Sequence, residues 1–357
     1  MKIVSVIGAR PQFVKAAVIS SAFDAAGIEE VLVNTGQHYD YNMAGQFLEE
    51  LGMRPPQYDL GVGQMSRAKQ LAEMIRKLEE VVSKESPDLV MVYGDTTSTL
   101  AGALVANSLN VPVAHVEAGL RSYDKSMPEE VNRILTDNVA DMLFCPTVEA
   151  VNNLEKEGVT GKVFNVGDIM YELALSVKER ALRETDILGK LEIEPKKYVL
   201  ATIHRQSNAD DAERLLAIVS AFCSSEKLIV FPVHPRTKKM LKEFGLSEKL
   251  SECDNVKLID PVGYMDMVSL EVNAERIVTD SGGVQKEAYF YEVPCVTVRD
   301  NTEWVETLNH GWNVLVSGTD EVEMREAIDS EREPSKREDY YGDGHTAEKI
   351  IKILKKG

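Results

Sequence analysis

Three carboxylates fall where strands of a parallel sheet would end or helices would begin. Asp95 follows the apolar run 89–93, Glu117 closes the run 113–117, and Glu129 opens a helical pattern. Because the carboxyl ends of parallel strands meet at one edge of a sheet, we expect these side chains to face one cleft. Grouped carboxylates can take up and return protons when burial and mutual repulsion raise a pKa toward neutrality. The group predicts acid and base chemistry.

Each carboxylate also has a purely structural interpretation. Asp95 and Glu129 could cap the helices that follow them, because side-chain oxygens satisfy the free N–H groups of a first helical turn. Glu117 could pair with Arg121 or Arg133. The sequence leaves these alternatives open.

A glycine turn in the second half of the chain predicts a site for a diphosphate. The apolar run 277–279 is followed by Asp280 and then by Ser281, Gly282 and Gly283. A strand that ends in such a turn presents backbone N–H groups at the start of a helix, which is a concave anion site. Glu287, one turn into that helix, could accept hydrogen bonds from a ribose diol. Close packing alone is the structural alternative for the glycines.

Other basic groups are placed to meet a phosphate. Arg10 lies between Gly8 and Pro11 where the first strand passes into a helix, and His204 and His234 each follow an apolar run. Glycine permits a tight turn, proline suits a first helical turn, and the helix start favours an anion. These positions predict contacts to phosphate or to a leaving group.

The remaining motifs narrow the ligand class. His115 lies inside a strand and is interpreted as a hydrogen-bonded core residue, and the six histidines show no metal-ligand spacing, so we expect no metal site. Gly61-Val62-Gly63 lacks the third glycine of a nicotinamide fingerprint, and no phosphate-binding P-loop is present. A diphosphate site without a dinucleotide motif indicates a nucleotide sugar, and we expect no cofactor.

Composition excludes several classes of partner. The chain has 357 residues and a formal net charge of −18, which argues against nucleic acid because a phosphodiester partner needs a basic surface. No apolar run is long enough to cross a bilayer. The cysteines, Cys145, Cys223, Cys253 and Cys295, are widely spaced, so we expect reduced thiols and a cytoplasmic protein.

Strand and helix patterns alternate along both halves of the chain, which predicts two doubly wound, Rossmann-like α/β domains facing a central cleft. Residues 1–168 form the first domain, residues 169–344 form the second, and a final helix at 345–357 crosses back to the first. The predicted strands are 2–7, 30–35, 89–93, 113–117, 142–145, 198–202, 228–233, 256–259, 276–279 and 295–298.

Several short motifs, in order along nearly the whole chain, resemble the non-hydrolysing UDP-N-acetylglucosamine 2-epimerases. The motifs are Gly8-Ala9-Arg10-Pro11-Gln12 with Lys15, Thr35-Gly36-Gln37-His38, Gly94-Asp95-Thr96-Thr97, His115-Val116-Glu117-Ala118-Gly119-Leu120-Arg121, Pro128-Glu129-Glu130-Val131-Asn132-Arg133, His204-Arg205, Pro232-Val233-His234-Pro235, Asp280-Ser281-Gly282-Gly283 and Arg299-Asp300-Asn301-Thr302-Glu303.

The resemblance implies a GT-B fold, a homodimer, no cofactor and a UDP-sugar substrate, with interconversion of UDP-GlcNAc and UDP-ManNAc. UDP would leave by anti elimination to give 2-acetamidoglucal and would then be added back. The resemblance gives acid and base roles to Asp95, Glu117 and Glu129, an orienting role to Arg133, and a catalytic role to His204. The implied substrate ligands are Arg10, Lys15, His234, Ser281, Gly282, Gly283 and Glu287.

Two further features of the resemblance concern regulation and substrate. Gln37, His38 and Arg205 match part of a second UDP-sugar site that activates bacterial members of the family. The segment Glu303-Trp304-Val305-Glu306, together with Pro11-Gln12-Phe13, resembles a branch that acts on C3-amino, C6-oxidised sugars of the UDP-2,3-diacetamido glucuronic acid type. A GT-B glycosyltransferase and a non-catalytic UDP-sugar sensor are the rival interpretations, because both would keep the nucleotide site.

Overall fold

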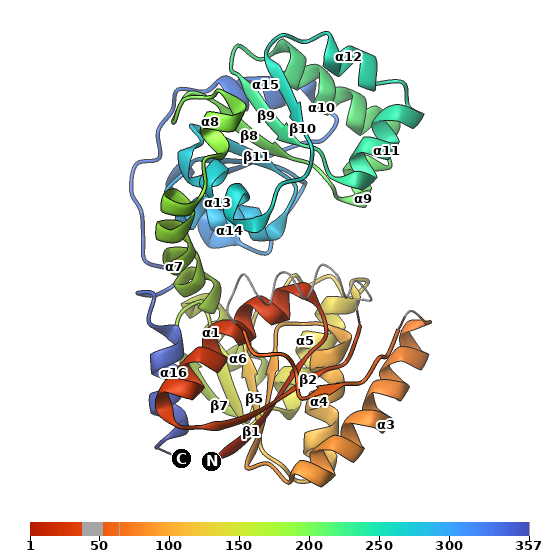
Figure 1. Ribbon diagram of the computed structural model, residues 1–357, viewed down its shortest axis with the longest axis vertical. Coiled ribbons are helices and arrows are strands. Elements are labelled where there is room, and N and C mark those ends of the chain that lie inside the picture. Colours follow the sequence, from red (N-terminus) through yellow and green to blue (C-terminus); the bar gives the residue numbers. More distant parts are fainter. Residues whose placement is uncertain (38–52, 64, 357) are drawn as a thin grey trace. The chain divides into compact units, whose positions relative to one another are not determined.

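The computed structural model describes residues 1–37, 53–63 and 65–356, and the chain divides into two compact units (Figure 1). Unit 1 comprises Met1–Leu173 together with Asp339–Gly357, and unit 2 comprises Ala174–Glu338. Each unit is built around one parallel sheet with helices on its faces. The predicted α/β fold with two parallel sheets is confirmed.

The described part of unit 1 contains a seven-stranded parallel sheet in the order β3-β2-β1-β4-β5-β6-β7. The strands are β1 (Lys2–Ile7), β2 (Glu29–Asn34), β3 (Tyr58–Asp59), β4 (Leu89–Tyr93), β5 (Val113–Val116), β6 (Met142–Cys145) and β7 (Lys162–Asn165). The helices are α1 (Arg10–Ala26), α3 (Arg67–Glu85), α4 (Thr97–Ser108), α5 (Pro128–Val139), α6 (Val148–Glu157), α7 (Ile169–Glu184), which runs into unit 2, and α16 (Thr346–Leu354).

Unit 2, all of which is described, contains a six-stranded parallel sheet in the order β10-β9-β8-β11-β12-β13. The strands are β8 (Val199–Thr202), β9 (Ile229–Pro232), β10 (Val256–Ile259), β11 (Arg276–Thr279), β12 (Cys295–Val298) and β13 (Asn313–Val316). The helices are α8 (Ile187–Leu191), α9 (Gln206–Ala209), α10 (Ala212–Ser224), α11 (Pro235–Glu243), α12 (Ser247–Ser251), α13 (Tyr264–Asn273), α14 (Gly282–Phe290), the 3-10 helix η1 (Val305–Gly311) and α15 (Glu321–Asp329).

The central strands explain why apolar runs were a reliable signal. Every residue of β4 is buried, and so is every residue of β5, β11 and β12. A parallel strand covered by helices on both faces must be apolar on both faces, so its sequence is a continuous run of hydrophobic residues. The chain reverses its direction of travel across each sheet between β1 and β4 and between β8 and β11. Open parallel sheets bind ligands at the carboxyl ends of strands at such points.

Gly8, between β1 and α1, is required by close packing. A Cβ atom added there would stand 2.0 Å from Oγ1 of Thr35 and 2.2 Å from Oγ of Ser98. These two hydroxyl groups are joined by a 2.8 Å hydrogen bond directly over the glycine. Glycine therefore lets the β1–α1 turn approach the start of α4.

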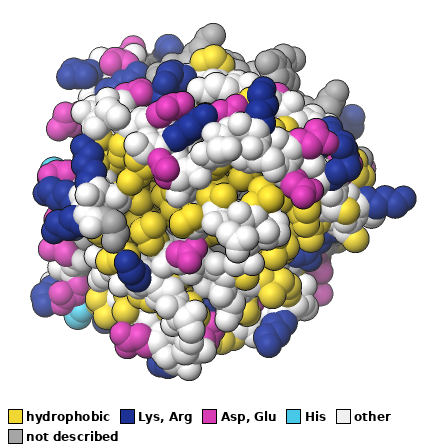
Figure 2. Space-filling view, turned by 90° about the horizontal axis from the view of Figure 1, so that it is seen from below, with side chains coloured by type: hydrophobic (Ala, Val, Ile, Leu, Met, Phe, Trp, Pro, Cys, Tyr) yellow, Lys and Arg dark blue, Asp and Glu magenta, His cyan; other side chains and the backbone are white. Residues whose placement is uncertain are grey.

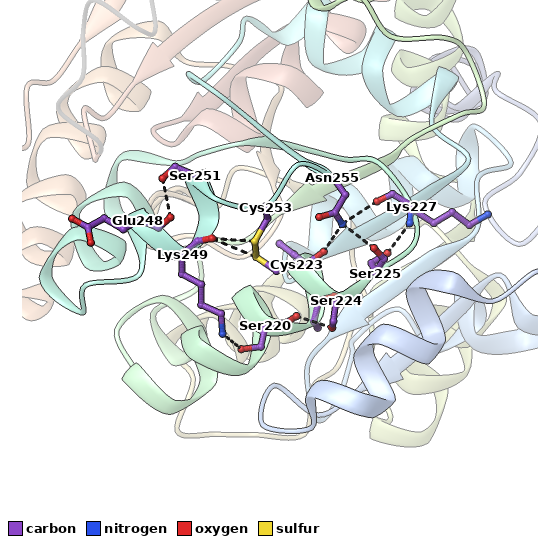
Figure 3. The surroundings of a disulfide bond; sticks show 12 residues. Ser220, Cys223, Ser224, Ser225, Lys227, Glu248, Lys249, Ser251, Cys253 and Asn255 are labelled. Atoms are coloured by element: carbon purple, nitrogen blue, oxygen red, sulfur yellow. Dashed lines mark hydrogen bonds between the residues drawn. A yellow bond between two sulfur atoms is a disulfide. The ribbon is translucent and has the colours of Figure 1, made fainter.

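Two of the cysteines contradict the expectation of reduced thiols. Cys223 at the end of α10 and Cys253 before β10 form a disulfide, with Cα atoms 5.4 Å apart (Figure 3). Their separation of 30 residues hid the pairing, because α10 and the α12–β10 connection meet only once β9 and β10 have formed. Cys145 and Cys295 are free and buried. The cysteine spacing therefore does not support a reducing compartment.

One face of the molecule, drawn in Figure 2, carries hydrophobic side chains near its middle and mixed basic and acidic side chains around them. Acidic side chains are therefore mixed with basic ones on this face and do not form one negatively charged surface. No helix in the described ranges is both long and apolar enough to span a membrane.

Candidate active site

Two of the predicted carboxylates lie at the ends of neighbouring strands in unit 1, each beside a cation. Asp95, in the turn after β4, forms an ion pair with Arg133 of α5. Glu117, directly after β5, forms an ion pair with Lys15 of α1, with 2.7 Å between Nζ and Oε2. The side chains of Lys15 and Glu117 are only 7% and 10% exposed, so water screens this pair weakly.

The backbone at Glu117 is unusual. Its φ angle is +72°, a left-handed conformation that costs a non-glycine residue on the order of 1–3 kcal/mol. Its N–H and that of Ala118 both donate to the carbonyl oxygen of Phe144 on β6, at 3.1 Å. The neighbouring strand thus holds the strained turn in place. Such strain is found where a side chain must be aimed at a reaction site.

Arg133 connects the Asp95 turn to the loop after Glu117. Its Nη1 lies 3.1 Å from Glu130 Oε2. Glu130 also accepts hydrogen bonds from the backbone N–H groups of Ser122 and Tyr123, both at 2.9 Å. The carboxylate of Glu130 is completely buried in this network, whereas Glu129, the next residue toward the helix start, is exposed. The structure therefore places Glu130, and not Glu129, among the buried groups around Asp95.

The structural alternatives for the carboxylates are wrong in their details. Thr96, and not Asp95, caps α4, because its Oγ1 accepts the N–H of Thr99. Met127 occupies the capping position of α5 and makes no side-chain cap. Arg121 pairs with Asp137 and Glu157, so neither predicted arginine is the ion-pair partner observed for Glu117.

Two polar residues that sequence reasoning did not assign to the site fix its backbone. Gln12 of α1 is buried, accepts the N–H groups of Gly8 and Ala9, and donates to the carbonyl oxygen of Tyr93 at 2.9 Å. Asn132 of α5 donates to the carbonyl oxygen of Asp95 at 2.8 Å. Their place inside the motifs around Arg10 and Glu129 was the only signal for this role.

In unit 2, Asp280 organises the ends of β8 and β11. This buried carboxylate accepts the backbone N–H groups of His204 at 3.1 Å and Arg205 at 2.9 Å, together with the side-chain amide of Asn208. His204 Nδ1 lies 3.4 Å from the same carboxylate. The connection after β8 is therefore tied to the turn that leads into α14, which carries Ser281.

The glycine turn opens α14 as predicted from the sequence. Ser281 caps the helix by accepting the N–H of Val284. A Cβ atom on Gly282 would lie 2.7 Å from Oε1 of Glu303 and 3.3 Å from Nε1 of Trp304, so a side chain there would have to displace the carboxylate of Glu303. Burial raises the pKa of Glu303, but Arg299, whose Nη2 is 2.9 Å away, outweighs burial and holds that pKa below its usual value.

His204, His234 and Glu287 were also predicted from the sequence to belong to the site in unit 2. The rings of His204 and His234 have centroids 5.5 Å apart. Burial lowers the pKa of His234, and the neighbouring His204 and Arg236 side chains lower it further through electrostatic repulsion. Glu287, one turn into α14, accepts a 3.5 Å hydrogen bond from the hydroxyl of Tyr264.

The comparison with protein families decides the identity. The family model described as UDP-N-acetylglucosamine 2-epimerase matches residues 21–355. The chain belongs to this family. It is an epimerase, and therefore an isomerase.

Relatives of this epimerase resemble it along their whole length. A Methanococcus maripaludis protein described as a UDP-N-acetylglucosamine 2-epimerase homolog is 50% identical, and the match covers 99% of each chain. The UDP-2,3-diacetamido-2,3-dideoxy-D-glucuronate 2-epimerase of Pseudomonas aeruginosa is 44% identical over all of both chains. The crystal structure of the Methanocaldococcus jannaschii UDP-GlcNAc 2-epimerase in complex with UDP-GlcNAc and UDP matches with a TM-score of 0.87, 42% identity and full coverage of both chains.

The residues predicted for a second UDP-sugar site in this epimerase are only partly described. Gln37 is tied to the start of α4, because its Oε1 accepts both the N–H of Ser98 at 3.0 Å and its hydroxyl at 2.7 Å. Arg205 precedes α9 in unit 2. His38 and the side chain of Arg10 lie outside the described residues. Nothing in the described ranges groups three or more His, Cys, Asp or Glu side chains as a metal site would.

Proposed function

We propose that this epimerase inverts C2 of a UDP-linked N-acetylated amino sugar by eliminating and re-adding UDP, and that it interconverts UDP-GlcNAc and UDP-ManNAc. The observation that carries the proposal is the pair of carboxylates at the ends of β4 and β5, each fixed by a cation. Inversion at C2 needs a group that removes a proton and a group that returns one to the opposite face.

In the proposed reaction, a carboxylate takes the C2 proton, a double bond forms between C1 and C2, and the bond from C1 to the UDP oxygen breaks. A proton then adds to C2 from the other face while a UDP oxygen adds to C1. Asp95, Glu117 and Glu129 are the proposed proton carriers, and Arg133 orients Asp95. Lys15 is ion-paired with Glu117. We therefore propose that Lys15 holds this carboxylate in place, in contrast to the substrate-binding role that the resemblance implies.

We propose that unit 2 binds the nucleotide. The N–H groups at the start of α14, with Ser281, Gly282 and Gly283, form a site for the diphosphate because a helix N-terminus favours an anion. Neutralising the diphosphate makes UDP a better leaving group. His204, His234 and Arg10 are proposed to assist this step, and Glu287 is proposed to bind the ribose.

A second candidate substrate is a UDP-2,3-diacetamido glucuronic acid sugar. The relative that acts on such a sugar, according to its name, is 44% identical to this chain, and the M. jannaschii UDP-N-acetylglucosamine 2-epimerase is 42% identical. Overall identity therefore does not choose between the two sugars. Incubation with each UDP-sugar, followed by NMR of the anomeric and C2 protons, identifies the substrate.

The reaction type is tested by turnover in deuterated water. The epimerase should place deuterium at C2, whereas a glycosyltransferase should not, and a UDP-sugar sensor should bind without turnover. Asp95→Asn and Glu117→Gln should each lower kcat by about 10²–10⁴-fold, the usual contribution of a general acid or base. The affinity of both variants for UDP should stay within about twofold, because neither Asp95 nor Glu117 is a proposed nucleotide ligand. Asp124→Asn, at an exposed carboxylate of unit 1, is the matched control. Wild-type turnover in both site variants would reject the assignment.

A further inference from the structure

His115 of β5 lies between the turn that carries Asp95 and the loop that follows Glu117. The ring is completely buried, and its Nε2 is 2.7 Å from the carbonyl oxygen of Gly94. Its Nδ1 is 2.7 Å from Oδ1 of Asp137 on α5. The structure thus confirms the interpretation of His115 as a hydrogen-bonded core residue, and it shows which two segments the ring joins.

The second oxygen of Asp137 extends this connection. It accepts a 2.7 Å hydrogen bond from Nη1 of Arg121 and a 3.2 Å hydrogen bond from the N–H of Gly119. Gly119 and Arg121 both belong to the loop that follows Glu117. His115 therefore reaches one reactive turn directly and the other through a single carboxylate.

The two hydrogen bonds of the ring determine its protonation. The Gly94 carbonyl can only accept, so Nε2 must carry a proton. Ionised Asp137 can also only accept, so Nδ1 must carry one as well. Asp137 has donors that do not depend on the ring, because Nη1 of Arg121 and the N–H of Gly119 both donate to its Oδ2 and favour the ionised carboxylate. A neutral ring beside ionised Asp137 would place a nitrogen lone pair against an oxygen 2.7 Å away.

The neighbours of the His115 ring on the adjacent strands carry no charge. The residues beside His115 in the strand register, Val92 on β4 and Leu143 on β6, are apolar. The thiol of Cys145 on β6 is neutral, because burial raises its pKa above the usual value.

The charged groups of this network form two balanced pairs. Asp137 compensates His115, and Glu157 of α6 compensates Arg121 through two hydrogen bonds of 2.8 and 2.7 Å. Buried charges are tolerated when they are paired and hydrogen-bonded in this way.

We propose that His115 is a positioning residue, held as an imidazolium, that fixes the Asp95 turn and the loop after Glu117 for the reaction. The positioning role of His115 in catalysis rests on the proposed function. The positive charge of its ring rests only on the hydrogen bonds described above. Gly94 has a φ angle of +62°, and its N–H donates to the carbonyl oxygen of Val116 at 2.9 Å. With its carbonyl bound to His115, both polar groups of the residue before Asp95 are held.

The charge of the ring is tested by NMR of the wild-type protein labelled with ¹⁵N-histidine. The chain has six histidines, and the His115 ring is assigned in the wild-type protein itself by labelling histidine with ¹³C as well and correlating each ring with its own backbone. We expect one-bond N–H couplings at both ring nitrogens of His115 between pH 6 and 8. A ring nitrogen without a proton in this range would overturn the proposal. This readout needs neither substrate nor turnover.

The positioning role is tested with two variants that each keep one donor. His115→Asn keeps a donor near the place of Nδ1, and His115→Gln keeps one near the place of Nε2. Both should lower kcat on the order of 100-fold, because small displacements of reacting groups cost about this much. The Kd for UDP should change less than twofold. His310→Gln, at a half-exposed ring in unit 2, should behave as the wild type.

Each outcome has a separate meaning. Wild-type kcat in both His115 variants overturns the positioning role. Retained turnover in Asp95→Asn and Glu117→Gln instead rejects the proposed proton carriers and leaves the NMR result standing. If the His115 variants do not fold, the NMR result of the wild-type protein still decides whether His115 is an imidazolium.

Discussion

Glu271 on α13 shows how strongly a single buried side chain can make stability depend on pH. It is 1% exposed, and its Oε2 accepts no hydrogen bond from the described residues. Burial raises the pKa of Glu271 well above its usual value, and the negative charge of Glu287 on α14 raises it further. Glu271 therefore holds its proton to a higher pH than an ordinary glutamate does, beside the residue proposed to bind the ribose.

Replacing Glu271 with Gln should flatten the pH dependence of stability. The folded state binds this proton more tightly than the unfolded state, so the stability it gives is complete below the unfolded pKa and is lost as pH rises toward the folded pKa. Above the unfolded pKa, the wild-type free energy of unfolding should lose up to about 1.4 kcal/mol per pH unit from this group. Urea denaturation between pH 5 and 8 measures the slope. Glu248→Gln, at an exposed carboxylate of the same unit, should leave the slope unchanged. An equally steep slope in Glu271→Gln would show that another group is responsible.

The sequence predicted where the reactive side chains stand but not which partners they have. Asp95 and Glu117 could be placed because each follows a continuous apolar run, and such runs mark the ends of buried parallel strands. Lys15 could not be predicted as the partner of Glu117, because α1 and β5 are distant in the sequence and meet only in the folded unit. The burial of Glu130 beside Arg133 could not be predicted either, because it depends on the rotation of α5 about its axis, which decides which of two adjacent side chains faces the interior.

At the scale of elements, the disulfide holds α10 to the connection before β10. Cys223 stands at the end of the helix and Cys253 follows α12. Asn255 reinforces the same junction, because its side-chain amide donates to the carbonyl oxygens of Phe222 at 2.8 Å and Ser225 at 2.9 Å (Figure 3). The bond therefore closes a loop over β9 and α11 in unit 2.

Removing the disulfide should destabilise unit 2 without affecting the proposed proton carriers. Closing a loop with a sequence separation of 30 residues restricts the unfolded chain, which corresponds to roughly 3–4 kcal/mol. Cys223→Ser, Cys253→Ser and the double variant should all melt at the same lowered temperature. The wild-type protein with a thiol reductant should match them, and kcat at 25 °C should be unchanged. An unchanged melting temperature in the double variant would contradict a stabilising disulfide.

Several edge strands were not predicted from the sequence. β3 has only two residues, and β13, which lies at the edge of the second sheet, is buried only at its two end residues. Edge strands bury one side and can be short, so they lack the continuous apolar run that identified the central strands. β7, also at an edge, has no fully buried residue. Periodicity therefore located the central strands and the edge strand β10, and it missed the edge strands β3, β7 and β13.

At the scale of the whole molecule, the last helix belongs to the unit that the first residues build. α16 packs against α1 (Figure 1), and its Ile350, Ile351 and Leu354 are buried. Lys355 Nζ donates to the carbonyl oxygen of Ala26 at 3.0 Å. Glu172 accepts the N–H of Ala347 at 2.8 Å, near the start of the helix. The core of unit 1 is therefore completed only when the end of the chain returns to it.

Deleting residues 346–357 should weaken unit 1 and spare unit 2. The deletion removes three buried aliphatic side chains and uncovers one face of α1, which should lower the free energy of unfolding by at least about 4 kcal/mol. Hydrogen exchange should accelerate in α1 and β1, while β9 and α10, in the disulfide-bonded unit, should keep their protection. A control deletion of residues 356–357 preserves Lys355 and the buried side chains, so it should exchange like the full chain. Equal loss of protection in both units would mean that α16 supports the whole molecule, and unchanged protection in α1 would mean that its packing there contributes little.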